Sequence, residues 1–420
     1  MSTAIIFVFI IGYILIAFEH NLNINKAATA LFTGVLCWTL FIMDSSDTHE
    51  TVNKLTEHLG DIAGILFFLL GAMTVVELID AHDGFTLITK FITTTNARKL
   101  LWIVGLISFF LSAVLDNLTT TIVMVSLLRK LISDQNKRLY FVGLVVIAAN
   151  AGGAWSPIGD VTTTMLWIGG QITTNHIITE LFLPSLVCLI VPVLILSIRF
   201  KGNIQRPKET AEDLKVASLK DRNIIFFSGI CILLFVPVFK TITHLPPFMG
   251  MLLGLAMLWF ISELLHKKKD DALKTNFSVV RALEKIDTPS ILFFLGILLS
   301  IAVLEIGGQL HQLSAWLGTL FSSSEAIAYV IGLLSAIVDN VPLVAASIGM
   351  YDLQTFPTDS IFWTFLAYCA GTGGSALIIG SAAGVAAMGI EKISFVWYLK
   401  KISLIALLGY TAGAIFFLLV

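Results

Sequence analysis

Charge is scarce in this 420-residue chain. Only 13% of its residues are Asp, Glu, Lys or Arg, whereas 57% are hydrophobic. An ordinary soluble domain has about 25% charged residues. A soluble fold of this size could not cover so much apolar side chain, so the composition excludes a cytosolic enzyme and a disordered protein. What remains is a protein with many membrane spans, because each span needs about 20 mostly apolar residues.

Excess positive charge is also absent. The chain has 26 Lys and Arg residues against 28 Asp and Glu residues, and its net charge is −2. No basic surface for nucleic acid is therefore predicted. The four cysteines all lie in apolar runs, and the sequence has no Cys or His cluster, so we expect neither disulfides, nor a soft-metal site, nor a cofactor. The cysteines are Cys37, Cys188, Cys231 and Cys369.

Apolar stretches of about the length of a membrane span occur along the whole chain. They are residues 4–18, 27–43, 62–79, 139–170, 178–199, 224–242, 248–265, 289–305, 360–390 and 402–420. Two further stretches, 100–128 and 326–350, are too short for two crossings, and each has an acidic residue near its centre. Irregular backbone at membrane depth is tolerated only inside protein or beside water. We therefore predict two re-entrant hairpins; the alternative for 100–128 is one long tilted helix.

The distribution of basic residues favours the hairpins. With both hairpins in place and the N-terminus outside, 24 of the 26 Lys and Arg residues fall on the cytoplasmic side, and only Lys54 and Lys240 fall outside. A full crossing at 100–128 would place the basic segment 129–138 on the side opposite to the basic segment 80–99. The positive-inside rule therefore predicts that both ends of the first hairpin are cytoplasmic and that both chain termini lie outside.

The two halves of the chain resemble each other at three places that occur in the same order. Each half has an Asp followed by Ile-Leu-Phe-Phe-Leu four residues later, then a Ser-Ala-x-x-Asp-Asn segment, then a Gly-Gly pair. The matching segments are 61–69 with 287–295, 112–117 with 335–340, and 152–153 with 373–374. Three matches at nearly one spacing indicate an internal repeat.

This repeat predicts the domain organisation. Each half has five spans and one hairpin, and because five is odd the second half must be inverted relative to the first. We therefore predict an all-α polytopic membrane protein with broken helices at the midplane, at 139–170 and 360–390. The predicted units are the first repeat, 1–199, a charged cytoplasmic linker, 200–222, and the second repeat, 223–420.

Three acidic residues lie deep in these predicted segments, although a carboxylate at the bilayer centre costs at least about 2.5–3.5 kcal/mol. Asp116 and Asp339 occupy equivalent positions in the two hairpins, and each is followed by an asparagine. Asp160 lies in the Gly- and Pro-rich break of the first broken helix, where the second half has Ser381. The predicted site is therefore acidic on one side and neutral on the other. The alternative for the hairpin acids is that they only cap helices, although Ser or Asn would serve there equally well.

Carboxylate, amide, hydroxyl and freed carbonyl oxygens are the ligands that hard cations prefer. Helix ends at a break add negative poles, which also favour a cation. The predicted cation- and proton-binding residues are Asp116, Asn117, Thr119, Asp160, Thr162, Thr163, Asp339 and Asn340, supported by Ser112, Ser156, Ser335, Thr372 and Ser381. Na⁺ is expected at Asp116, Asp160 and Asp339. Since burial disfavours a charged carboxyl group, Asp116 or Asp160 is also expected to take up a proton in competition with Na⁺.

These same residues carry a family resemblance. Ser112, Asp116, Asn117 and Thr119, their counterparts from Ser335 to Asn340, and the segment from Ser156 to Thr163 resemble the ion transporter superfamily, and most closely its NhaD-type sodium/proton antiporters. The resemblance extends from about Asp61 to Val420. It implies an inner-membrane bacterial carrier that exchanges Na⁺ or Li⁺ for protons. It further implies a scaffold domain, a transport domain that moves like an elevator, and a homodimer in the lipid bilayer.

Two other functions remain as alternatives. Carboxylate transporters of the same superfamily, which include sodium-coupled dicarboxylate carriers, have Ser-Asn-Thr at the hairpin tip. Asp116-Asn117 stands there in this chain, and a fixed carboxylate repels an anionic substrate. The second alternative is an intramembrane aspartyl protease that uses Asp116 and Asp160 as a dyad. Proteases of that type have a Gly-x-Gly-Asp motif, whereas the residues here are Pro157-Ile-Gly-Asp160.

Overall fold

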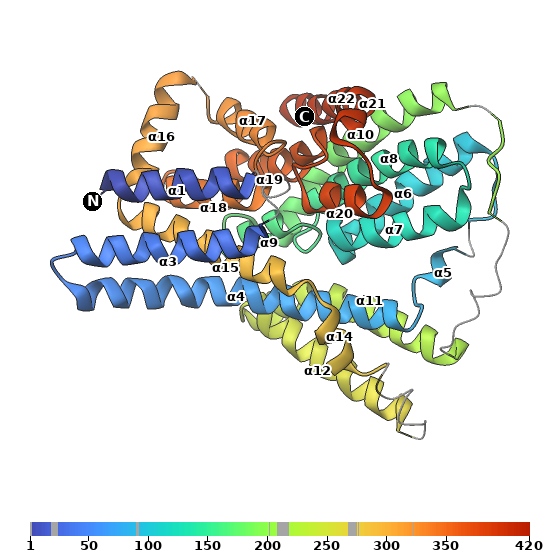
Figure 1. Cartoon of the computed structure of the whole chain (residues 1–420), viewed down its shortest axis with the longest axis horizontal. Coiled ribbons are helices and arrows are strands. Elements are labelled where there is room, and N and C mark those ends of the chain that lie inside the picture. Colours follow the sequence, from blue (N-terminus) through green and yellow to red (C-terminus); the bar gives the residue numbers. More distant parts are fainter. Residues whose placement is uncertain are drawn as a thin grey trace.

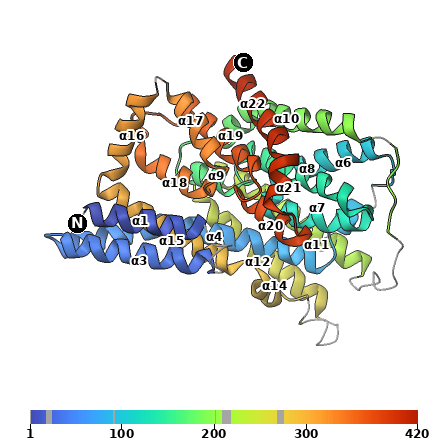
Figure 2. The same cartoon turned by 45° about the horizontal axis from the view of Figure 1, so that its top comes forward.

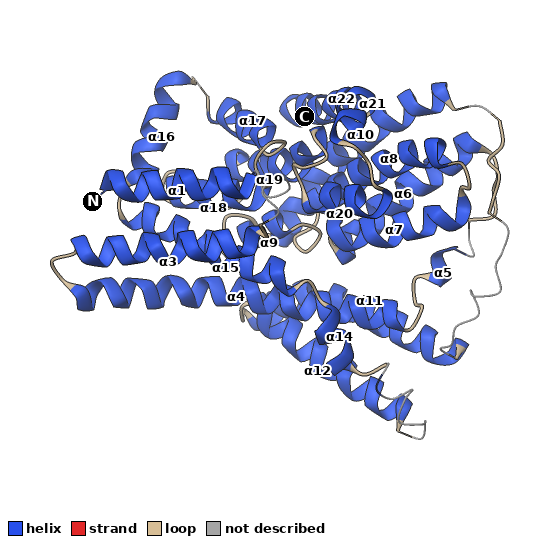
Figure 3. Ribbon diagram, viewed as in Figure 1, coloured by secondary structure: helices blue, strands red, loops and turns tan. Residues whose placement is uncertain are grey.

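The computed structural model describes residues 2–17, 24–89, 92–200, 202–207, 218–267, 275, 277–321 and 323–420. Helices and loops make up this described part of the chain, which confirms the all-α prediction (Figures 1 and 3). The helices of the first half are α1 (Ser2–Ala17), α3 (Lys26–Asp44), α4 (Thr48–Ala81), α5 (Thr86–Thr89), α6 (Ala97–Leu115), α7 (Asn117–Leu131), α8 (Gln135–Ala154), α9 (Val161–Ile168) and α10 (Thr174–Arg199). Those of the second half are α11 (Leu219–Thr243), α12 (Pro247–His266), α14 (Val279–Lys285), α15 (Thr288–Ile306), α16 (Gln309–Leu320), α17 (Ser324–Leu334), α18 (Asn340–Met350), α19 (Ile361–Gly373), α20 (Ala382–Glu391), α21 (Phe395–Lys401) and α22 (Ser403–Leu419).

The predicted spans are helical, and the structure adds helical segments that were not predicted, among them the first turns of α4 and helix α16. Within the described residues, seven helices are long and apolar enough to cross a membrane, or up to nine if each bent helix pair counts as one span. Helix α4 begins at Thr48 instead of residue 62, because Asp47 caps its N-terminus and a polar first turn carries the Glu50–Lys54 ion pair of 2.7 Å. A search for apolar runs misses such a turn. Helix α16 was not predicted either, since its sequence is of mixed polarity.

The first predicted hairpin is present, and the single tilted helix is wrong. Helices α6 and α7 meet at Asp116, and they pack against each other and against α8. At the other end of the hairpin, Ala97 N donates to Gly202 O and Ser133 N donates to Gln205 O, each at 3.0 Å. Because the start of α6 and the end of α7 contact the same short segment, the chain enters and leaves on one face.

The second hairpin consists of α17 and α18. Ser323, which precedes α17, and Tyr351, which follows α18, line one pocket of about 600 Å³ together with His311. Both ends of this hairpin therefore also lie on one face. Its tip differs from the first, because four residues in turns separate α17 from Asp339. Pro342 lies in the first turn of α18, where its missing N–H costs nothing.

Helix α10 shows that the two hairpins enter from opposite faces. At its start, Thr173 donates to both carboxylate oxygens of Asp359, at 2.6 and 2.7 Å, in the loop that follows the second hairpin. At its end, Ser197 O accepts from Arg98 Nε, at 2.8 Å, beside the start of the first hairpin. With 26 residues, α10 is about 39 Å long. The hairpins are therefore inverted relative to each other, as the repeat requires.

Both broken helices are present, and the same backbone contacts recur in them. The breaks lie between α8 and α9 and between α19 and α20. A Cβ atom on Gly152 would overlap Phe109 O, and a Cβ on Gly373 would overlap Gly332 O. Phe109 and Gly332 are 223 residues apart, which is the spacing found for the hairpin motifs. Glycine at these positions lets each hairpin contact its broken helix backbone to backbone.

The two repeats are also joined by a buried ion-pair cluster. Glu391, at the end of α20, has a side chain that is 1% exposed. Its two carboxylate oxygens accept from Arg129 Nε of α7 at 2.6 Å and from Arg138 Nε of α8 at 3.0 Å. An acid of the second repeat thus binds two helices of the first.

Figures 1 and 2 show α6, α7 and α8 at one end of the molecule, and α1, α3 and α15 at the end where the N-terminus lies.

About half of the predicted linker at 200–222 lies outside the described residues, since 201 and 208–217 are not described. Of the described part, residues 202–207 lie against the outer ends of the first hairpin, and residues 219–222 belong to the first turn of α11. The division of the chain into units at 1–199 and 223–420 stays a prediction.

Candidate cation site

The tips of both hairpins and the first helix break meet at one small cavity. It has a volume of about 60 Å³, and Asp116, Asp160 and Asp339 all line it. The three acids come from three separate segments, and the structure brings them to a common space. Lys26, at the start of α3, lines the same cavity and was not predicted as a site residue.

Asp116 forms the turn between α6 and α7. Its Oδ1 accepts from Thr119 N at 2.7 Å and its Oδ2 accepts from Thr119 Oγ1 at 2.9 Å. The backbone of Asp116 has φ 79° and ψ 163°, a conformation that only glycine adopts easily and that costs other residues about 1–3 kcal/mol. The hairpin therefore keeps a carboxylate at a position where the backbone alone would favour glycine.

Asp160 is the most deeply buried of the three acids, at 2% exposure. Its Oδ1 accepts from both the N–H and the hydroxyl of Thr162, each at 2.8 Å. Its Oδ2 accepts from Asn117 Nδ2 at 2.5 Å. The prediction placed Asn117, Asp160 and Thr162 in one site, and in the structure their side chains form one hydrogen-bonded group.

Asn150 extends this group into the second repeat. Its Nδ2 donates to Ser375 Oγ and to Ser381 Oγ, each at 2.9 Å, and its Oδ1 accepts from Asn117 Nδ2 at 3.1 Å. Sequence reasoning assigned no role to Asn150 or Ser375. A signal was available, because Asn150 is the only amide side chain in the buried run from 140 to 154.

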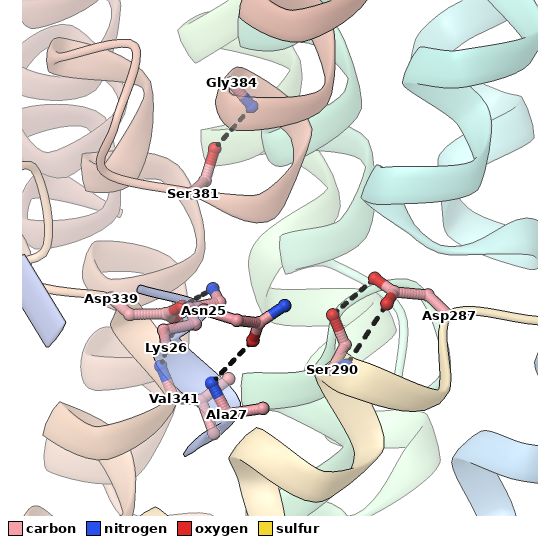
Figure 4. Close-up of polar contacts among 9 residues, drawn as sticks. All are labelled: Asn25, Lys26, Ala27, Asp287, Ser290, Asp339, Val341, Ser381 and Gly384. Atoms are coloured by element: carbon pink, nitrogen blue, oxygen red, sulfur yellow. Dashed lines mark hydrogen bonds and ion pairs between the residues drawn. The ribbon is translucent and has the colours of Figure 1, made fainter. Parts of the chain in front are cut away.

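Asp339 has a different kind of partner. Its Oδ2 lies 3.2 Å from Lys26 Nζ, and its Oδ1 accepts from Val341 N at 3.3 Å. The Lys26 ammonium also lies 4.4 Å from the centre of the Phe293 ring, in cation–π geometry. Figure 4 shows Lys26 and Asp339 together with Asp287 and Ser290 at the start of α15. Asn340, next to Asp339, is buried at the start of α18.

The capping role considered for the acids is observed. Asp116, Asp160 and Asp339 are the N-caps of α7, α9 and α18, and Ser381 is the N-cap of α20. The positive ends of these helices therefore lie at the acids, while α6 and α8 bring their negative ends to the same breaks. Capping does not account for the acids fully, because each of them also lines the cavity.

Several predicted residues hold the backbone of the breaks rather than line the cavity. Thr163, predicted as an ion ligand, donates its hydroxyl to Ser156 O at 2.8 Å and Asp160 O at 2.9 Å. The predicted supporting residues Ser112, Ser156, Ser335 and Thr372 likewise donate to backbone carbonyls, of Ala149, Ala113, Gly332 and Tyr368 respectively. The bonds of Ser112 and Ser156 tie the first hairpin to the first broken helix, and Ser335 makes a second, longer bond to Ala370 O in α19. The bonds of Thr163 and Thr372 stay within their own segments.

Among the described residues, no three His, Cys, Asp or Glu side chains converge closely enough to hold a metal ion. The three aspartates share a cavity, but they do not form a preformed three-carboxylate ligand set. The prediction that Na⁺ binds at all three stays a prediction.

A larger space of about 400 Å³ adjoins the cavity; we call it the vestibule. Lys26 and Ser290 line both spaces, so the two meet at these residues. At its other end the vestibule is lined by Glu77, Asp80 and Lys285, and Lys285 Nζ lies 3.3 Å from Glu77. The vestibule reaches the end of α4, on the side of the first hairpin's basic ends.

Known proteins match this chain along almost its whole length. Residues 13–365 match a family described as citrate transporter. Sodium/proton antiporter 1 of Arabidopsis thaliana is 50% identical over 98% of this chain and 71% of its own length, and sodium/proton antiporter 2 of the same plant is 48% identical over 98% and 97%. The Na⁺/H⁺ antiporter NhaD of Vibrio cholerae is 33% identical over 99% of this chain and 91% of its own length.

A solved structure has a similar fold. The YdaH transporter of Alcanivorax borkumensis, whose crystal structure is described as revealing an unusual topology, superposes with a TM-score of 0.58 over 89% of each chain. Its sequence is only 11% identical, so the likeness concerns the fold alone.

Proposed function

Because the chain belongs to the citrate transporter family and to the family of the NhaD sodium/proton antiporters, we propose that it exchanges Na⁺ for H⁺ at the cavity lined by Asp116, Asp160 and Asp339. Membership of these families makes it a membrane transporter and not an enzyme. Li⁺ is proposed as a second substrate. The relatives come from plants as well as bacteria. We therefore propose Na⁺/H⁺ exchange without assigning it to a bacterial membrane. The basic ends of the first hairpin are proposed to lie on the cytoplasmic side.

The observation that carries this proposal is the placement of the acids at helix N-termini. The N-terminus of a helix is an anion-binding site, because its free N–H groups and its positive pole both point outward. Four such ends meet at this site, and the protein's own carboxylates cap three of them. An anionic substrate would have to displace them. With these positions filled, the site is suited to a cation.

The size of the cavity argues in the same direction. A water molecule takes up about 30 Å³ of liquid volume, and pockets for organic ligands typically have about 300–1,000 Å³. A cavity of about 60 Å³ is suited to an ion with little water and not to a dicarboxylate or to citrate. The vestibule is larger, but among its described lining residues the three acids Glu77, Asp80 and Asp287 outnumber the two lysines, Lys26 and Lys285, so its net negative charge disfavours such anions.

Exchange follows from competition for the same oxygens. Burial disfavours the ionised form of a carboxyl group, so an empty cavity with charged aspartates is costly. Either Na⁺ or protons relieve that cost. We propose that the loaded cavity is exposed to one face and then the other by alternating access, and that the empty, charged cavity does not make this change. The elevator-like movement and the homodimer implied by the family resemblance belong to this proposal.

The test is exchange by the purified protein in liposomes with a trapped pH-sensitive dye. Wild type should move protons when Na⁺ or Li⁺ is added, and not when K⁺, succinate or citrate is added. Asp116→Asn and Asp339→Asn keep the size of each side chain and remove its charge, and each should lower exchange at least about tenfold. Asp352→Asn is the matched control, because Asp352 is exposed and outside the cavity.

Robust Na⁺/H⁺ exchange by both cavity variants would show that the hairpin acids only cap their helices. Citrate or succinate uptake by wild type without Na⁺-driven proton movement would favour the carboxylate carrier.

A further inference from the structure

The exchange proposal leaves Lys26 without a role, although its ammonium group lies in the cavity. We propose that Lys26 is a tethered counter-cation, which neutralises Asp339 so that the cavity takes up two monovalent cations instead of three. The inference rests on the proposed function and adds the number of cations and the side on which they bind.

The position of Lys26 in its own helix does not explain the residue. Lys26 is the first residue of α3, and a cation at a helix N-terminus is opposed by the helix dipole. The cap itself is supplied by Asn25, whose Oδ1 accepts from Ala27 N at 2.9 Å. The partner of the ammonium is instead Asp339, 313 residues away, at 3.2 Å. A tertiary interaction therefore accounts for a lysine at this place.

Neighbouring elements place titratable groups around the pair. The break before α9 contributes Asp160, and the first hairpin contributes Asp116. Helix α15 contributes Asp287, which accepts from Ser290 and lies in the vestibule. Helix α4 contributes Glu77, which is already paired with Lys285, and Asp80. Helix α1 contributes the phenol of Tyr13, within electrostatic range of Asp339.

The charge of the cavity follows from its lining. Within the described part of the chain, three carboxylates line it and Lys26 is the single cation that does so. With all four groups ionised the cavity has a charge of −2. Buried charge without a partner is strongly unfavourable, so two monovalent cations, whether Na⁺ or H⁺, bring the cavity to neutrality. Without Lys26, neutrality would require three.

Lys26 also makes the two hairpin tips chemically different. The Asp116 carboxylate is bound by the neutral donors of Thr119, whereas the Asp339 carboxylate is bound by an ammonium. Asp160 is bound by neutral donors as well. The free negative charge therefore lies on the first-repeat side, between Asp116 and Asp160. The incoming cation should bind there.

The test is a charge-balanced set of four variants, Lys26→Gln, Lys26→Arg, Asp339→Asn and the double variant Lys26→Gln/Asp339→Asn. Direct binding of radioactive Na⁺ to the purified protein is measured at one fixed alkaline pH, together with half-saturating Na⁺ and the maximal exchange rate in liposomes. Thermal unfolding of each variant shows that it is folded.

Removing the ammonium leaves a charge of −3 and should tighten Na⁺ binding about tenfold or more, whereas Asp339→Asn leaves −1 and should weaken it by a similar factor. The double variant has the wild-type charge of −2 and should return to within about threefold of wild type. Lys26→Arg should also stay within about threefold, since it keeps the charge. A purely structural ion pair predicts something else: both single variants lose stability and rate, and neither tightens Na⁺ binding.

Failure of this inference can be told apart from failure of the proposed function. If wild type exchanges Na⁺ for protons but the two single variants do not shift Na⁺ affinity in opposite directions, Lys26 is not a counter-cation. If wild type neither binds nor exchanges Na⁺, the proposed function itself is wrong. Should Lys26→Gln not fold, the double variant and Asp339→Asn still decide the question, because the charge count predicts near-normal affinity for the first and weakened affinity for the second.

Discussion

Asn117 Nδ2 donates to Asp160 Oδ2 at 2.5 Å, so the tip of the first hairpin holds the carboxylate of the first broken helix. The same nitrogen donates to Asn150 Oδ1 at 3.1 Å. One amide thus joins the hairpin tip to both sides of the break in the first broken helix. The orientation of the most buried acid in the cavity depends on a neutral neighbour that supplies no charge of its own.

Asn117→Ala should therefore weaken Na⁺ binding while leaving all three carboxylates in place. The change leaves a buried carboxylate oxygen without its donor, which costs about 1–3 kcal/mol and corresponds to about fivefold to 150-fold in half-saturating Na⁺. Half-saturation is measured in liposomes. Asn53→Ala in α4 serves as control, because Asn53 is exposed and its amide is hydrogen-bonded to His49 within the same helix. Equal Na⁺ affinity in both variants would remove Asn117 from the site.

Asp160→Ser should make the two halves alike, since Ser381 stands at the matching position. The variant loses one charged ligand and one proton-accepting group, so apparent Na⁺ affinity should fall and the pH dependence of exchange should change. Thr163→Ala should have the milder effect, because its hydroxyl donates to the backbone carbonyls of Ser156 and Asp160 rather than facing the cavity. Measuring half-saturating Na⁺ and Li⁺ at several pH values compares the two. An Asp160→Ser protein with unaltered affinity and pH profile would place the ion at the hairpin tips alone.

Gly152→Ala and Gly373→Ala should each destabilise the protein by about 1–3 kcal/mol, because the added methyl group would overlap the backbone of a hairpin. Gly60→Ala and Gly318→Ala are matched controls in helices where a Cβ has no neighbour within 4 Å. Those two should be neutral or stabilise by about 0.5–1 kcal/mol, from helix propensity alone. Thermal unfolding in detergent measures all four. If the control variants lost as much stability as Gly152→Ala and Gly373→Ala, the contacts between hairpin and broken helix would not be tight.

Cysteines at positions 135 and 354 should be labelled from opposite sides of the membrane. Gln135 follows the first hairpin and Gln354 follows the second, and both residues are exposed. The background must lack native cysteines, since Cys231 is exposed. An impermeant reagent added to intact cells should modify only position 354, because the basic residues around 135 predict a cytoplasmic location. Labelling of position 135 from outside would reverse the orientation.

The hairpins and breaks could be predicted because they interrupt an otherwise apolar pattern. A carboxylate, an asparagine or a Gly-Gly pair inside a membrane segment is costly, and its recurrence at one spacing gave the location of both tips. The start of α4 was missed, because a polar turn with a good cap is helical without being apolar. Asn150 was missed because a single amide in a buried run shows no partner in the sequence.

Lys26 could not be assigned from the sequence at all. It lies just before an apolar run, where a lysine normally marks the cytoplasmic end of a span, and it was counted as such. Its partner Asp339 is 313 residues away, and no repeat or motif connects the two. The pairing depends on how α3 packs on α15 and α15 on α18 of the second hairpin, which is a tertiary property.

The ion pairs of Arg129 and Arg138 with Glu391 have a consequence for how the protein folds during its synthesis. When the ribosome has completed the first repeat, these two arginines still lack their acid, which is synthesised more than 250 residues after them. Ser375 and Ser381, the partners of Asn150, arrive equally late. The first hairpin can therefore be inserted early but reaches its final packing only after most of the chain has left the translocon. A chain truncated before Glu391 should accordingly be inserted, recognised as incomplete and degraded, even though its first repeat is intact.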